Sequence, residues 1–169
     1  TYTYNRELNN IVLKLQDLRN SVTQNHDLSQ PSVFARRKAV DIAWKYEVAD
    51  VKMGGDGSEK WTHDEKLQIL KDGRLKGAEG HHQLNVANHS ELQADPDNIK
   101  FFRTKAEHLN KGHNGSWNNE SRGYLYNKNE MLEKTNMKRI VYNELSGLCQ
   151  VCMIAAVIGF SISFLSISR

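Results

Sequence analysis

The stretch EGHHQLNVANHSELQADPDNIKFFRTKAEHLNKGH, residues 79–113, holds five of the seven histidines in a chain of 169 residues. Histidine is a common metal ligand, and its side chain titrates close to neutral pH, so this concentration points to a chemical site. The alternative is a set of solvated side chains in a polar region. The elements predicted around these histidines favour the first interpretation.

Two short strands and a helix are predicted within and just before this stretch. The segment RLKGAEGHH, residues 74–82, predicts a strand that ends on His81 and His82, whose side chains face opposite sides because strand residues alternate. The segment DNIKFF predicts a second strand beginning at Asn98. The sequence TKAE at 104–107 has the spacing of a capping box, so a helix is expected to begin there. This strand–strand–helix unit would bring together His81, His82, Asn98, His108 and His113.

The combination resembles the HNH, or ββα-metal, nucleases, in particular the group marked by Gly-His-His that occurs in bacterial polymorphic toxins. The similarity runs from about Trp61 to Gly123 and rests on KGAEGHH, NVANHSELQADPDNI, EHL and HNGSWNNESRG. It implies that His82 is the general base that activates water, and that Asn98 orients this base or contacts the metal. It implies a supporting role behind the site for Glu79. The metal ligands that it implies are His81, His108 and His113.

The chemistry of phosphodiester cleavage suits such a set of side chains. A neutral imidazole can take a proton from water near pH 7, and a cation stabilises the charge that develops on the phosphate. Three imidazole ligands leave an open coordination position, as catalytic metal sites do. One divalent ion is therefore expected, with Zn, Mg, Mn and Ni all left open.

One spacing departs from the family pattern. Related toxins usually place the last two histidines four residues apart, whereas His108 and His113 are five apart, or about 140° around a regular helix. We expect Gly112 to end the helix in a left-handed turn, so that His113 folds back toward the site. If it does not, His113 is no ligand. His89 is expected to be a solvated loop residue.

The net charge of +3 is too small to predict nucleic-acid binding by itself. Basic residues close to the histidines are nevertheless candidates for phosphate contacts, with an ordinary solvated face as the alternative. Trp117 is expected to pack under the site. The candidate phosphate-binding residues are Lys100, Arg103, Lys105, Lys111 and Arg122.

The rest of the chain predicts mostly helices. Apolar residues at helical spacing predict a helix over about the first 20 residues. A second helix is expected from near Pro31, with Phe34, Ile42, Val48 and Val51 facing inward. A capping box at Thr62 and Glu65 predicts a third helix, which ends at Gly73. The expected fold class is α+β and mostly helical: a ββα-metal nuclease core with N-terminal helices and a C-terminal apolar helix.

The C-terminal part of the chain is strongly apolar. Residues 145–168 contain no charged side chain, and such a run is long enough to cross a bilayer. Insertion in a membrane is favoured over a buried core helix, and small residues in the run would permit self-association. The predicted division is therefore an N-terminal helical region (1–60), a nuclease domain (61–130) and a C-terminal, membrane-interacting helix (131–169).

Two functions from different classes follow. The first is a metal-dependent HNH endonuclease, acting on DNA rather than RNA and tolerant of sequence, in a bacterial toxin or antiphage defence effector. The expected partners are then an immunity protein, a larger parent polypeptide and a second copy bound through the C-terminal helix. The nuclease would lie in the cytoplasm on a membrane-associated protein, or be delivered into a target cell. The alternative is a membrane-anchored structural metal-binding module without catalysis.

Overall fold

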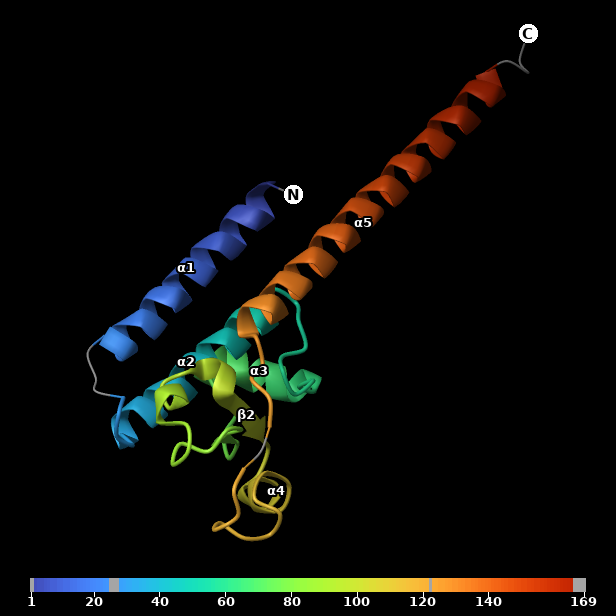
Figure 1. The fold of residues 1–169 in the computed structure, drawn as a ribbon. Coiled ribbons are helices and arrows are strands. Elements are labelled where there is room, and N and C mark those ends of the chain that lie inside the picture. The colour runs from blue at the N-terminus through green and yellow to red at the C-terminus, as the bar shows by residue number, and fades with distance from the viewer. Residues whose placement is uncertain (1, 25–27, 122, 166–169) are drawn as a thin grey trace.

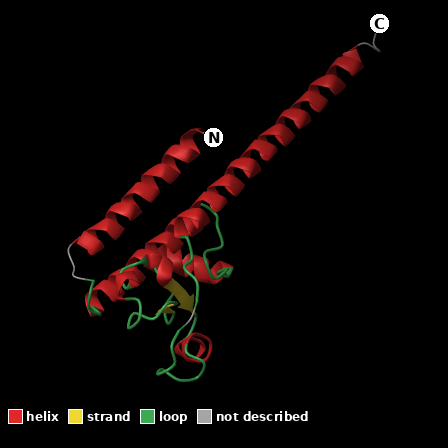
Figure 2. Cartoon of the chain, in the orientation of Figure 1, coloured by secondary structure: helices red, strands yellow, loops and turns green. Residues whose placement is uncertain are grey.

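The computed structural model describes residues 2–24, 28–121 and 123–165, with side chains in the last helix as far as residue 147. Two long helices, α1 and α5, lie beside the central helix α2, and a small two-stranded sheet lies against α2 further along (Figures 1 and 2). The elements in chain order are α1 (Tyr2–Gln24), α2 (Val33–Lys52), α3 (His63–Asp72), β1 (Glu79–His82), η1 (Ser90–Leu92), η2 (Pro96–Asn98), β2 (Ile99–Phe102), α4 (Lys105–Glu107), η3 (His108–Gly112) and α5 (Lys128–Leu165).

Helix α2 carries an apolar cluster on each of two faces. Its small residues Ala35, Ala39 and Ala43 are fully buried, and they let neighbouring elements approach closely. One cluster joins α2 to α1 and to the start of α5. The other joins α2 to α3 and β2, where Trp44 packs on Phe101 with ring centroids 4.0 Å apart. The sheet is thereby fixed against the middle of the molecule.

The predicted helices are largely confirmed. Helix α1 buries Leu8, Leu15 and Val22 along one stripe, as the apolar spacing requires. Helix α2 begins at Val33, after an N-cap at residue 32, close to the predicted start near residue 31. The prediction that Phe34 faces inward is wrong: its side chain is 49% exposed. The small residue that follows it takes the buried position on that turn.

Helix α3 forms as its end signals predict. The Thr62 hydroxyl accepts from the Glu65 backbone N–H, and the Glu65 carboxylate accepts from the Thr62 backbone N–H at 2.8 Å. Gly73 ends the helix with φ 75°, a left-handed conformation that favours glycine. Local capping therefore sets both ends of α3.

The two predicted strands are present but short. They pair antiparallel, with Glu79 opposite Phe102 and His82 opposite Ile99. Strand β1 covers only the last four residues of the predicted segment, and β2 begins one residue after Asn98, which ends the short helix η2. A mostly helical α+β fold is confirmed at this level.

No helix in the part of the chain that the structure describes is long and apolar enough to cross a membrane. The expected membrane insertion and self-association concern residues 145–168, and the side chains from residue 148 onward lie outside the described residues. The prediction of a C-terminal membrane helix is therefore unsupported, although α5 itself continues to Leu165.

Candidate active site

Gly80, the glycine of the Gly-His-His motif, lies where β1 touches α2. A Cβ at this position would lie 2.8 and 2.9 Å from the two methyl carbons of Val40 and 3.3 Å from Ile99 Cγ2. A side chain would therefore push the strand away from the helix. Glycine lets β1 lie directly against α2, and this contact places His81 and His82 beside the first turns of that helix.

Three of the histidines come together as the sequence predicts. His81, His108 and His113 each offer a nitrogen, and these atoms all lie within 4.8 Å of one another. His81 Nδ1 is 2.9 Å from His108 Nε2. Burial, followed by the charges of the neighbouring histidines, lowers the pKa of His81 to about 3. The ring is therefore neutral at physiological pH, which is the form that binds a metal.

The five-residue spacing is accommodated by a change of helix type. Residues His108–Gly112 form a π-helix, in which the wider turn brings positions five apart close to the same face. The expected left-handed turn at Gly112 is wrong, since positive φ angles occur instead at Asn114 (47°) and Gly115 (82°). The rings of His108 and His113 end 5.0 Å apart between centroids.

Gly112 is needed for space. A Cβ there would lie 3.0 Å from His108 Cδ2, 3.1 Å from Phe102 Cε2 and 3.2 Å from His81 Nδ1. Such contacts are tighter than packed side chains normally allow. The absence of a side chain thus lets the π-helical turn sit directly over two of the three clustered rings.

Groups behind two of the three histidines fix the orientation of their rings. The Nδ1–H of His108 donates to Glu79 Oε2 at 2.7 Å, which leaves Nε2 with a lone pair facing His81. The Nδ1–H of His113 donates to the backbone carbonyl of Asn119 at 3.3 Å. Trp117 lies against His108 and His113, with ring centroids 5.2 and 5.0 Å away. The residues present therefore suit a divalent metal: three nitrogen donors, two of them held in the required tautomer.

His82 lies apart from this cluster and has a different partner. Its Nε2–H donates to the backbone carbonyl of Gln93 at 3.0 Å, so Nδ1 carries a lone pair and can accept a proton. Burial lowers the pKa of His82; the bond to Gln93 acts in the opposite direction, and the charge of Arg36 lowers it further. The geometry gives His82 the form of a proton acceptor.

Gln93 fixes the carbonyl that holds His82. Its side chain is fully buried and bonds three backbone groups between α1 and α2: Nε2 donates to the carbonyls of Leu28 (3.1 Å) and Gln30 (2.9 Å), and Oε1 accepts from Ser32 N–H (2.5 Å). Sequence reasoning missed this residue, because a glutamine in a polar loop carries no local signal.

Gln93→Leu is expected to lower the free energy of unfolding by about 1–3 kcal/mol, because backbone groups near α2 lose buried partners. Urea denaturation of the purified chain measures this. Gln16→Leu is the matched control, since Gln16 bonds the surface side chain of Asn20 and its loss should cost less than about 0.5 kcal/mol. Equal stability of the two variants would show that the Gln93 bonds contribute little.

Asn98 closes the loop between the strands. It is fully buried; its amide donates to the Leu84 carbonyl at 3.0 Å, and its Oδ1 accepts from the Leu84 N–H at 2.8 Å. Arg19 of α1 holds the preceding turn through Asp95 (2.9 Å) and Asp97 (3.1 Å). The side chain of Asn98 thus bonds the backbone of the loop that carries Gln93, the partner of His82.

The predicted phosphate-binding residues have mixed surroundings. Arg103 bonds Glu65 at 2.7 Å, and Lys111 pairs with Glu107 at 2.6 Å, so both charges have partners. Lys100 and Lys105 are exposed, and Arg122 lies outside the described residues. His89 lies in the loop, 43% exposed at its side chain, with Nδ1 3.4 Å from Glu91. Its predicted solvated position is confirmed.

A pocket of about 300 Å³ opens between the three histidines and His82. The proton acceptor His82 therefore lines the same pocket as the three clustered histidines, and a small substrate group could bind there. Its lining residues include His81, His82, His108, His113, Arg36 and Ser121.

A family of known proteins matches part of this chain. Residues 33–103 match a family described as the GHH signature containing HNH/Endo VII superfamily nuclease toxin. The resemblance drawn from the sequence is thus confirmed for this segment. The match begins at α2, before Trp61, and ends before His108 and His113. The division into 1–60, 61–130 and 131–169 stays a prediction.

The chain is also similar to much longer animal proteins. It is 33% identical to teneurin-1 of Mus musculus over 87 residues and 38% identical to teneurin-3 of the same species over 69 residues. These matches cover 52% and 41% of this chain but only 3% and 2% of the relatives. Teneurin-m of Drosophila melanogaster is 32% identical over 69 residues, which is 41% of this chain and 2% of that protein.

Proposed function

We propose that this chain is a metal-dependent endonuclease that hydrolyses phosphodiester bonds in nucleic acid. The observation that carries the proposal is a single pocket that is lined both by His82, whose Nδ1 carries a lone pair, and by the cluster of His81, His108 and His113. The family match to nuclease toxins over residues 33–103 supports it.

The three clustered histidines would hold one divalent ion. When bound, such an ion supplies positive charge that stabilises the phosphate and the leaving oxygen. Glu79 accepts the Nδ1–H of His108 and would thereby hold its ring ready to bind the ion, and Trp117, which packs on His108 and His113, would limit the movement of both rings. The identity of the ion stays open among Zn, Mg, Mn and Ni.

His82 would be the general base. Its Nδ1 takes a proton from water while the water oxygen forms a bond to phosphorus and the bond from phosphorus to the leaving oxygen breaks. The backbone carbonyl of Gln93 accepts from Nε2–H throughout and stabilises the imidazolium that forms. Asn98 would act as a positioning residue, because it fixes the loop and not the reacting atoms.

The alternative of a structural metal module explains less of this arrangement. Structural zinc sites are usually closed by four protein ligands. Within the part of the chain that the structure describes, three histidines form the cluster, and His82 turns its Nε2 away to Gln93. His82 lines the pocket and is held in one tautomer, with Nδ1 able to accept a proton, and this arrangement suits catalysis.

Incubation of the purified chain with supercoiled plasmid and a divalent metal is expected to give nicked and linear products, and a chelator should stop the reaction. Agarose gels measure both. Contacts to the backbone predict a broad range of fragments, because they carry no sequence information. Intact plasmid with every divalent metal would contradict the proposal, and one defined cut site would contradict sequence tolerance.

The biological setting belongs to the same proposal. DNA is favoured over RNA as the substrate. The proposed role is that of a bacterial toxin or defence effector, with an immunity protein as its partner. The family description supports the toxin role. The small share of the large relatives that this chain covers is consistent with a larger parent polypeptide.

A further inference from the structure

A second groove, which shares His82 with the first pocket, runs along the first turns of α2. It is lined by His82, Glu79, Gly80 and His108 from the site and by residues of α2 that include Arg36 and Arg37. Arg36 also lines the pocket between His82 and the three clustered histidines. One arginine therefore borders both spaces that meet at the proposed general base.

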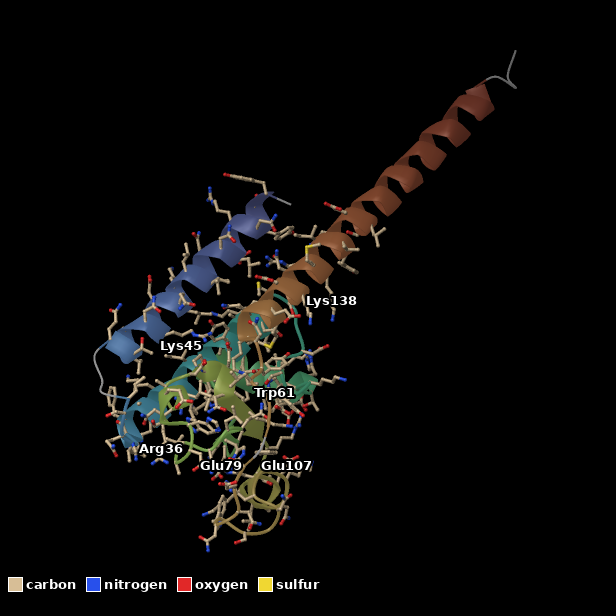
Figure 3. All side chains as sticks on the ribbon, viewed as in Figure 1. Arg36, Lys45, Trp61, Glu79, Glu107 and Lys138 are labelled. Carbon is tan, nitrogen blue, oxygen red and sulfur yellow. The ribbon has the colours of Figure 1, made fainter. Side chains whose placement is uncertain are left out.

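The position of Arg36 follows from the contact between β1 and α2. Val40 touches Gly80, and Arg36 lies one helical turn earlier, so its side chain is brought alongside the residues that follow Gly80 in the strand. Figure 3 shows Arg36 and Glu79 at the same end of the molecule, whereas Lys138 lies on α5 away from them.

The charge of this groove is positive. Arg36 and Arg37 are exposed, and the ion pairs found among the described residues include neither of them. Arg74 is paired with Asp41 at 3.2 Å, and Glu79 is engaged by His108 at 2.7 Å. Both acidic side chains that line the groove, Asp41 and Glu79, therefore already have partners. The guanidinium groups of Arg36 and Arg37 are available to bind an external anion.

We propose that Arg36 and Arg37 form a docking site for the phosphodiester backbone of the nucleic acid that is cut at His82. Guanidinium groups bind phosphate oxygens in a bidentate manner. Arg36 binds the phosphate nearest the reacting one, and Arg37, the next residue of α2, binds a neighbouring phosphate. The inference rests on the proposed nuclease function and adds the path that its substrate follows.

The test measures binding and not cutting. The full chain with His82→Ala is titrated into a fluorescently labelled 20-base-pair duplex at several salt concentrations, and anisotropy gives the dissociation constant. Each phosphate contact to duplex DNA contributes about 0.9 to the slope of log K against log salt. Adding Arg36→Ala should lower this slope by about 0.9, and adding Arg37→Ala as well should lower it by about 1.8.

Lys138→Ala, in the same His82→Ala background, is the matched control because it removes an equal charge from a distant surface. Its slope should equal that of the parent. DNA binding by the parent with an unchanged slope in the Arg36 and Arg37 variants overturns the inference alone. Failure of the parent to bind DNA at low salt overturns the proposed function, and the inference falls with it.

Discussion

His82→Ala is expected to lower the rate of plasmid cleavage by about two to four orders of magnitude, the usual contribution of a positioned general base. The substitution removes the only side-chain atom proposed to take the proton from water. Bound metal should stay unchanged, because the nitrogen cluster consists of three other residues, His81, His108 and His113. Rates of nicking and metal content by atomic absorption measure the two effects on one preparation.

His89→Ala is the control for this variant. His89 lies in the same stretch of sequence, but its side chain contacts Glu91 and does not line the pocket. It should cut at close to the wild-type rate. Rapid cutting by His82→Ala would remove His82 as the base. Loss of metal from His82→Ala would instead place His82 among the ligands.

The local parts of the fold were predictable because their causes lie close together in the sequence. The stripe that Leu8 and Leu15 form along α1 repeats at helical spacing. Thr62 and Glu65 satisfy each other's backbone at the start of α3. The three clustered histidines were predictable through the family pattern, since their spacing and the glycine before them carry it.

The parts that could not be predicted depend on contacts between distant segments. Gln93 meets Leu28 and Ser32, more than 60 positions away, and nothing in its own neighbourhood indicates that. Arg36 reaches the site only because Gly80 lets β1 lie against α2. The phosphate-binding candidates predicted from the sequence lie near the histidines in the chain, whereas Arg36 and Arg37 come near His82 only in the folded structure.

The π-helix is a local feature that the residue spacing did not predict. Positions five apart on a regular α-helix diverge, so the spacing of His108 and His113 argued against a shared metal. The sequence predicts a left-handed turn at Gly112 that brings His113 back, whereas in the structure residues His108–Gly112 form a wider, π-helical turn. The absence of a side chain at Gly112 permits this, because a Cβ there would lie too close to atoms of His108, Phe102 and His81.

His108→Ala is expected to weaken metal binding by more than 100-fold, and cleavage should fall with it until excess metal partly restores the rate. Loss of a group that only supports a ligand costs about 10–100-fold. Glu79→Gln, which removes the carboxylate that accepts from His108 Nδ1, should therefore fall within that smaller range. Isothermal titration with zinc or nickel gives the affinities, and thermal melting of each variant checks that it is folded.

His113→Ala then decides whether the wide turn serves metal binding. If the π-helix brings His113 into the ligand set, its loss should weaken affinity as much as the loss of His108. His63→Ala, at the exposed start of α3, is the control and should bind metal like the wild type. Unchanged affinity in His113→Ala would reduce the site to two histidines. Unchanged affinity in His108→Ala would remove the best-supported ligand, since Glu79 orients that ring, and the proposed metal site would fail.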